Sequence, residues 1–405
     1  MRILLQGSSL TLQLIFPFVN QVRKYDSSIK FQATGMIVNG HVHTGDESEL
    51  ANIEKSHRPY LGMRLPKRIN HPLIDKIVRR AHREVAVRTL RFRSKSFLRE
   101  IDLLHIQGLF SPKEELRYCK IFHRKPIVVS CWGSDVLRTD SPKTYTQQQR
   151  VLKRADAITV CSPEFRDIVL AKYGQDLREK IYFTQFSPNI EGVLEADHDL
   201  ARENFRESHK IEPEKVCVGI GHNGHEANQH LGILESIKKL NPEISQLIHL
   251  ILPMTYGSQP AYLEKVKAAL VASGLTYEII TEFMDDQAVA ELRHALDVFI
   301  YAPISDAFSA SVSQALAAGS ECILGSWLPY KLRAQAGLKY TEINTIEEAG
   351  EALASVIPKN LGDKDRQLTN RTASIEMFNP EKLGRQWASV YQAAKNSAQL
   401  RNHPS

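Results

Sequence analysis

Cysteine is scarce in this sequence and widely spaced. The 405 residues hold five cysteines, at positions 119, 131, 161, 217 and 322, and no two of them form a C-x-x-C pair. The odd number and the wide spacing exclude the disulfide framework that holds many small secreted domains together. The pattern indicates buried free thiols in a reducing compartment.

Long apolar runs are also missing. No stretch of roughly 18 apolar residues runs without a charge, so the sequence predicts no membrane-spanning helix. The apolar run that starts at Ile3 is interrupted at Gln6, too early for the apolar region of a secretory signal peptide. The net charge is only +6, which is weak evidence for any partner, and no low-complexity tract occurs. We expect a globular, cytoplasmic chain.

The length and the apolar pattern predict two α/β domains. A single core stops growing at about 250–300 residues, and this chain is longer. Strand-like apolar runs at 3–5, 102–107, 126–130 and 157–161 alternate with helical segments, as in doubly wound parallel sheets. The alternation then restarts, with its strands predicted at 216–220, 248–253, 277–281, 298–301 and 321–324.

The point at which the alternation of strands and helices restarts sets the predicted domain limits. We predict an N-terminal Rossmann-like domain at 1–190 and a second at 191–379. A C-terminal helix at 380–396, with Leu383, Trp387 and Tyr391 on one face, is assigned to the first domain.

The most informative stretch is 297–325, which reads DVFIYAPISDAFSASVSQALAAGSECILG. Its order predicts a strand ending near Pro303, a loop with Asp306, a helix starting near Ser309, and a new strand after Gly319. Ligands of open α/β sheets bind beyond the carboxyl ends of the strands. A helix N-terminus at that edge offers free N–H groups and a positive dipole end, which suit a diphosphate.

Several side chains of this stretch could contact a sugar nucleotide. Ser309 and Ser311 place hydroxyl donors in the first helical turn, and the Gln314 amide can hydrogen-bond vicinal ribose hydroxyls. The structural alternative makes Asp306 a loop or capping acid and Ser309 an N-cap. An isolated Asp-x7-Gln pair occurs often by chance, so the prediction depends on the surrounding strand, loop and helix.

These residues resemble the signature of GT-B glycosyltransferases, especially the retaining group called family 4. The family pattern is an apolar strand, Pro-Ser, Glu, seven residues, and E-A-M-A-x-G. Here Pro303, Asp306 and Gln314-A-L-A-A-G stand at those positions, with Asp and Gln replacing the two Glu residues. The resemblance implies that Asp306 contacts the sugar and Gln314 the ribose. It also implies two domains facing a cleft, with the C-terminal helix crossing back.

Further segments resemble the same family in the same order. Residues 102–108 are similar to its D-x-x-H-x-H-G strand end, and 126–135 to its P-x-V-x-T-x-H-G-S-D segment, with Trp132 at the usual His. Residues 155–162 resemble its A-D-x5-S strand, and 186–190 its I-P-N-G-V entry to the linker. Five such segments in the right order are more specific than any one of them.

One loop departs from the family 4 pattern. Residues 219–229 carry no Arg or Lys, where a basic pair usually holds the diphosphate. Together with L-P-M-T-Y-G at 252–257, this loop is similar to bacterial transferases that add 4-acetamido-4,6-dideoxygalactose to a lipid-linked acceptor. That resemblance implies that Asn223, Gly224, Met254, Thr255 and Tyr256 line the donor site. The alternative for 219–224 is a tight turn without a ligand.

Other candidates stand at predicted strand ends. Gly7 would let the first loop, with Ser8, approach a diphosphate closely. His105 could bind the donor sugar or activate the acceptor hydroxyl, or be a satisfied buried histidine. Asp135 is either a base in an inverting reaction or a cap before Val136. Phe283 would lie near the nucleotide base, with a core position as its alternative.

Neither a metal nor a cofactor is predicted. The D-x-D triplets at 197–199 and 363–365 do not close apolar strands, so both are interpreted as loop acids. The resemblance to GT-B enzymes implies that fixed dipoles and basic groups stabilise the leaving diphosphate.

The segment 64–99 is strongly basic. It holds twelve Lys or Arg and only two acids, Asp75 and Glu84, interleaved with apolar residues. Such amphipathic segments lie on anionic lipid surfaces. A solvated helix face and a nucleic-acid patch are the alternatives, and we favour membrane contact and expect no nucleic-acid partner.

The sequence therefore predicts a metal-independent glycosyltransferase at the inner face of the membrane. It would move a sugar from a nucleotide-diphosphate donor to a glycan or lipid-linked acceptor in surface polysaccharide synthesis. Two alternatives remain: a sugar-nucleotide epimerase of the same fold, or a non-catalytic partner of a transferase, for which the replacements at Asp306 and Gln314 would be typical.

Overall fold

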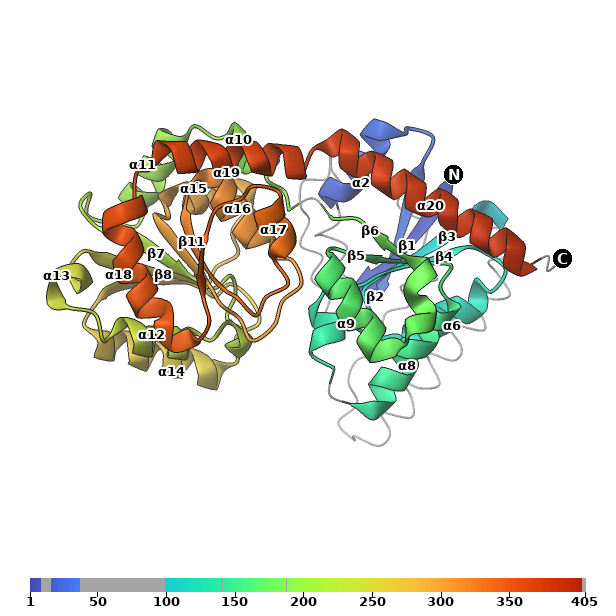
Figure 1. The fold of residues 1–405 in the computed structure, drawn as a ribbon, viewed down its shortest axis with the longest axis horizontal. Coiled ribbons are helices and arrows are strands. Elements are labelled where there is room, and N and C mark those ends of the chain that lie inside the picture. The colour runs from blue at the N-terminus through green and yellow to red at the C-terminus, as the bar shows by residue number, and fades with distance from the viewer. Residues whose placement is uncertain (9–15, 37–98, 140, 187, 403–405) are drawn as a thin grey trace. The chain divides into compact units, whose positions relative to one another are not determined.

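The computed structural model describes residues 1–8, 16–36, 99–139, 141–186 and 188–402. The chain divides into two compact units, the first made of residues 1–186 and 380–405 and the second of 187–379. Each unit contains a parallel sheet, with six strands among the described residues (Figure 1). The predicted doubly wound α/β architecture is confirmed.

The sheet of the first unit is built around strands that the sequence predicts as apolar runs. Its spatial order is β2 (Lys30–Met36), β1 (Arg2–Ser8), β3 (Leu103–Gln107), β4 (Ile127–Ser130), β5 (Ala157–Val160) and β6 (Ile181–Phe183). The strand order reverses between β1 and β3, so the loops after these two strands diverge. Such a switch point opens a crevice at the carboxyl edge of the sheet.

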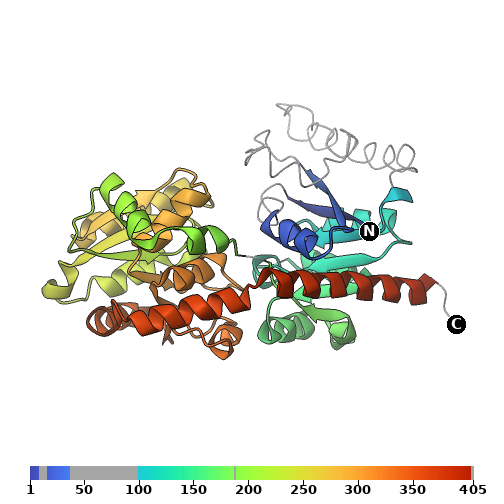
Figure 2. The same cartoon turned by 90° about the horizontal axis from the view of Figure 1, so that it is seen from above.

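Helices cover both faces of this sheet. On one face lie α2 (Phe16–Tyr25) and the C-terminal helix α20 (Pro380–Asn402), and on the other α6 (Pro112–Ile121), α8 (Pro142–Arg154) and α9 (Pro163–Tyr173). Figure 2 follows α20, in red, along the first unit. Leu383, Trp387 and Tyr391 of α20 are each at most 2% exposed, as their spacing of four predicts.

The sheet of the second unit has the order β12 (Thr341–Ile343), β11 (Glu321–Gly325), β10 (Val298–Tyr301), β7 (Val216–Ile220), β8 (Ile248–Pro253) and β9 (Thr276–Ile280). The order reverses between β7 and β10. The loops after these strands therefore flank the switch point of this sheet, and the sequence predicts both as binding loops.

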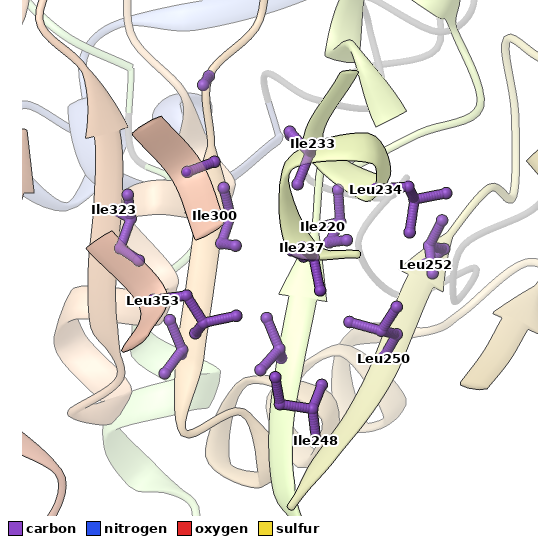
Figure 3. Close-up of a cluster of buried hydrophobic side chains, with 14 of the residues drawn as sticks. Ile220, Ile233, Leu234, Ile237, Ile248, Leu250, Leu252, Ile300, Ile323 and Leu353 are labelled. Atoms are coloured by element: carbon purple, nitrogen blue, oxygen red, sulfur yellow. The ribbon is translucent and has the colours of Figure 1, made fainter. Parts of the chain in front are cut away.

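The main apolar core of the second unit fills the space between the sheet and α12 (His230–Ile237), α14 (Pro260–Ser273) and α18 (Ala349–Asn360). Figure 3 shows Ile220, Leu250, Leu252 and Ile300 of the strands pointing toward Ile233 and Leu353 of the helices. The other helices of the unit include α10 (Glu191–Glu195), α11 (His198–Ser208), α15 (Asp286–Ala295), α16 (Ala310–Ala318), α17 (Lys331–Gln335) and α19 (Lys364–Met377).

No helix in the described ranges is both long and apolar enough to span a bilayer. The basic segment 64–99 lies outside the described residues, apart from its last residue.

Candidate functional site

The loops after β7 and β8 meet at the carboxyl edge of the second sheet. The Gly224 N–H donates to the Tyr256 carbonyl at 2.8 Å. The Asn223 side chain accepts from the Asn228 amide at 2.7 Å and from the His225 N–H at 2.9 Å. A Cβ at Gly224 would collide with Ser258, so glycine is required for this close approach. Three predicted donor-site residues, Asn223, Gly224 and Tyr256, are therefore neighbours.

The remaining predicted residues of these loops differ in exposure. Met254 is 2% exposed and belongs to the apolar core, so its side chain supports the loop from below. Thr255 is half-buried, Tyr256 is 47% exposed, and Phe283 in the loop after β9 is 75% exposed. Phe283 is thus not a core residue, and its ring is accessible at the edge where the base was expected.

The helix predicted from Ser309 to Gly319 forms as expected. Ser309 is the N-cap of α16, and its hydroxyl accepts from the Val312 N–H at 3.3 Å. Gly319 ends the helix in the left-handed region, with φ of 95°. Ser311 is half-buried in the first turn. The N-terminus of α16 therefore lies at the carboxyl edge beside the switch point, where a helix end can bind an anion.

Asp306 lies in the loop before α16 and is partly exposed. One of its carboxylate oxygens accepts a hydrogen bond of 2.5 Å from the Tyr330 hydroxyl. The same hydroxyl oxygen accepts from the Ser309 N–H at 3.2 Å. Burial raises the pKa of Tyr330 well above its usual range, so this phenol stays a hydrogen-bond donor.

Gln314 is 9% exposed and is already bonded within the second unit. Its amide oxygen accepts from Arg293 Nε at 3.2 Å, and its amide nitrogen donates to the Pro188 carbonyl at 2.9 Å. Each group of a side-chain amide can form a second hydrogen bond, so a ribose contact would use the remaining capacity.

Two buried guanidinium groups lie beside α16, and sequence reasoning missed both. Arg333 is 0% exposed and donates to Ser313 Oγ at 2.8 Å and to the Ser309 carbonyl at 2.7 Å. Arg293 is 4% exposed, and burial lowers its pKa to about 10. Burial lowers the pKa of Arg333, and the negative charge of Asp306 acts in the opposite direction. Both remain positive at neutral pH, so they add to the positive end of α16.

The candidates of the first unit lie within its core. His105 is 0% exposed; its ring nitrogens are 3.1 Å from Tyr391 Oη and 2.7 Å from Ser130 Oγ. Burial lowers the pKa of His105 to about 3, so the ring is neutral. This environment favours the alternative of a satisfied buried histidine over a catalytic one.

Asp135 organises a turn at the carboxyl ends of β3 and β4. Its carboxylate accepts from the backbone N–H groups of Leu109, Trp132 and Gly133 at 2.8–3.0 Å. Burial raises the pKa of Asp135, and these donors act in the opposite direction. The geometry favours the capping alternative. Gly7 is buried near the end of β1 and pairs in register with Gly35; Ser8 is the last residue of that strand.

A cavity of about 220 Å³ lies at the opposite, amino edge of the second sheet, near the starts of β10 and β11. Its arginines are already paired, Arg202 with Asp297 at 2.8 Å and Arg366 with Glu321 at 2.7 Å. It is therefore separate from the candidate site. The described ranges contain no cluster of three or more His, Cys, Asp or Glu suited to a metal ion.

Comparisons with known proteins agree with this geometry. The fold is that of the GT-B glycosyltransferases. A family model described as Glycosyltransferase Family 4 matches residues 41–182. No curated protein matches the chain. The domain match and the fold together support a glycosyltransferase enzyme, the class predicted from the sequence.

Solved structures share the fold over nearly the whole chain. Anabaena HepE, in complex with UDP and glucose, has a TM-score of 0.71 at 14% identity, over 97% of this chain and 100% of HepE. A glycosyltransferase from Rickettsia africae gives 0.69 at 14% identity, over 97% and 98%. Sucrose-phosphate synthase from Thermosynechococcus elongatus gives 0.70 at 11% identity, over 97% and 98%.

Proposed function

We propose that this chain transfers a sugar from a nucleotide-diphosphate donor to a glycan or lipid-linked acceptor, without a metal. The second unit would bind the donor and the first the acceptor. One observation carries the proposal: Asp306 and the start of α16 lie at the switch point of the second sheet, beside the buried guanidinium groups of Arg293 and Arg333. HepE, of the same fold, has been crystallised with UDP and with UDP-glucose.

The two buried guanidinium groups support an anionic ligand. They bring two positive charges to α16, and Asp306 is the carboxylate that acts on Arg333. A bound diphosphate would add further negative charge beside them. The positive end of α16 acts in the same direction, and this explains how the site can do without the basic pair that is missing from 219–229.

The reaction would break the bond between the anomeric carbon and the diphosphate oxygen. The acceptor oxygen would form the new bond to that carbon and lose its proton, while the diphosphate leaves with an added negative charge. Fixed donors at the α16 N-terminus would stabilise that charge. Asp306 would contact the sugar ring, where positive charge develops in the transition state.

The donor loops also motivate a finer proposal. The arrangement of Asn223, Gly224 and Tyr256 supports donor lining as in transferases of 4-acetamido-4,6-dideoxygalactose. A role in surface polysaccharide synthesis at the membrane would follow. Titrating UDP, GDP and dTDP by calorimetry tests the donor claim, because a chain that binds none of them would be a non-catalytic partner. A change in sugar configuration without acceptor would instead support the epimerase alternative.

Replacing Gln314 with Ala should weaken nucleotide binding by roughly 1–3 kcal/mol if the amide contacts the ribose. Calorimetry with the tightest-binding nucleotide measures the effect on folded protein. Gln287→Ala is the matched control, since Gln287 is an exposed amide on α15 that bonds Glu291. Equal affinities for the two variants would remove Gln314 from the ribose site.

The basic segment 64–99 should bind anionic vesicles. Co-sedimentation with phosphatidylserine-containing liposomes should exceed that with neutral liposomes, and the difference should shrink as salt rises. Equal sedimentation with both vesicle types would contradict membrane contact through this segment.

A further inference from the structure

The loop that carries Asp306 is held at three points by one short segment. Trp327 Nε1 donates to the Pro303 carbonyl at 2.7 Å. Tyr330 donates to Asp306 at 2.5 Å, and Arg333 donates to the Ser309 carbonyl at 2.7 Å. The three donor residues are spaced three positions apart, at 327, 330 and 333, and so are the residues that accept from them, at 303, 306 and 309. We call residues 327–333, which follow β11, the clamp.

The clamp residues are themselves fixed by their surroundings. The Arg333 guanidinium lies 3.9 Å from the centre of the Phe308 ring and 4.9 Å from that of Tyr330. The Tyr330 backbone carbonyl accepts from the Tyr340 hydroxyl at 3.2 Å. Tyr330 is 2% exposed and Arg333 is 0% exposed. A planar guanidinium stacked on two rings loses little further freedom when it binds the loop.

Tyr330 links the acid of the loop to the start of the helix. Its hydroxyl donates to the Asp306 carboxylate while its oxygen accepts from the Ser309 N–H, the residue that caps α16. The position of the carboxylate is therefore fixed relative to the N–H groups of the first turn. An enzyme gains rate when such groups are held in place before the substrate arrives.

We propose that Trp327, Tyr330 and Arg333 are positioning residues that preset Asp306 against the α16 N-terminus for the sugar of the donor. This inference rests on the proposed function, in which Asp306 contacts the sugar and α16 the diphosphate. Tyr330 acts through Asp306 and does not itself contact the ligand.

The substitution Tyr330→Phe tests the clamp, because it keeps the ring and removes only the hydroxyl. Two affinities are measured by calorimetry: that of the nucleoside diphosphate and that of its glucose derivative, using UDP, GDP or dTDP, whichever binds most tightly. We expect the variant to bind the glucose derivative about tenfold more weakly and the bare diphosphate within about twofold of the unchanged protein. A general loss of structure would instead lower both affinities, that for the bare diphosphate and that for its glucose derivative.

Two further variants complete the design. In the background of Asp306→Ala, which removes the acceptor, Tyr330→Phe should cause no additional loss of affinity for the glucose derivative, since that effect passes through the carboxylate. Tyr277→Phe is the matched control, because it also removes a single tyrosine hydroxyl, at an exposed position on β9 of the same unit and away from the clamp. It should leave both affinities unchanged.

Amide hydrogen exchange provides a readout that needs no ligand. Tyr330→Phe should accelerate exchange at residues 304–312 by about tenfold, and Tyr277→Phe should not. Unchanged exchange there would overturn the clamp even if nucleotides bind. Accelerated exchange in a protein that binds none of the nucleotides would instead overturn the proposed function and retain the clamp as a structural device without a donor.

Discussion

Replacing Trp387 with Ala is expected to destabilise the first unit by about 3–5 kcal/mol, the range for a large buried aromatic. Trp387 is 1% exposed, and its ring centre lies 4.6 Å from that of Phe18, 4.9 Å from Phe186 and 5.3 Å from His105. Its indole N–H donates to the Gln185 carbonyl at 3.0 Å. The variant leaves both a cavity and an unpaired buried carbonyl.

Urea unfolding followed by far-UV circular dichroism measures this loss. Domains typically have a stability of about 5–15 kcal/mol, so the first unit should unfold at a much lower urea concentration while the second keeps its own transition. Leu400→Ala on the same helix is the control, since Leu400 is 75% exposed and should change stability by no more than about 0.5 kcal/mol. Similar losses in both variants would contradict the packing described for α20.

Acid is expected to destabilise the first unit through His105. The pKa of His105 is about 3 in the folded chain against an ordinary value of 6.5, because the ring is buried. Between these values the unfolded chain binds a proton that the folded chain does not. Stability should therefore fall as the pH falls from 6.5 to 3, by on the order of 1.4 kcal/mol for each pH unit.

Glu115 gives stability the opposite dependence on pH, and it does so at higher pH. Burial raises its pKa from 4.5 to about 8, so the folded chain holds a proton that the unfolded chain loses. Its contribution to stability therefore falls as the pH rises from 4.5 to 8. The two slopes offset each other between 4.5 and 6.5, which leaves the acid loss visible below 4.5 and the alkaline loss above 6.5.

Single substitutions separate the two groups. His105→Gln should flatten the slope below pH 4.5, and Glu115→Gln the slope above pH 6.5, in urea melts of the first unit. His123→Gln, at an exposed position of the same unit, is the control for His105. A profile of His105→Gln that parallels the unchanged protein in the acid range would show that another group dominates the acid response.

Sequence reasoning predicted the central strands more accurately than the edge strands. The bounds of β7, β8 and β10 match the predicted runs, because a strand buried on both faces is apolar on successive residues. The strands β2, β6 and β12 were missed. All three lie at sheet edges, and β6 and β12 have only three residues each, too few to be distinguished as strands by an apolar run.

In the candidate site, too, the sequence predicted the local features and missed the contacts between distant residues. The helix α16, its serine N-cap and its terminal glycine follow from local rules of helix ends, and the sequence alone predicted them. The contacts of Tyr330 and Arg333 with Asp306 and Ser309 join residues 24 positions apart. No local pattern reveals such a pairing, since it exists only after β10 and β11 lie side by side. Likewise, nothing in the local sequence distinguished a buried His105 from an accessible one.

Because α20 belongs to the first unit but follows the second in the chain, the second unit is completed first during synthesis. All residues of the second unit have been added to the chain before α20 is made, whereas the first unit still lacks Trp387, Val390 and Tyr391 of its core when Pro380 is added. The first unit therefore cannot cover this face of its sheet until α20 has been made, although its strands are made first. Its apolar surface stays exposed through the synthesis of the second unit, and binding by a chaperone during that interval would protect it from aggregation.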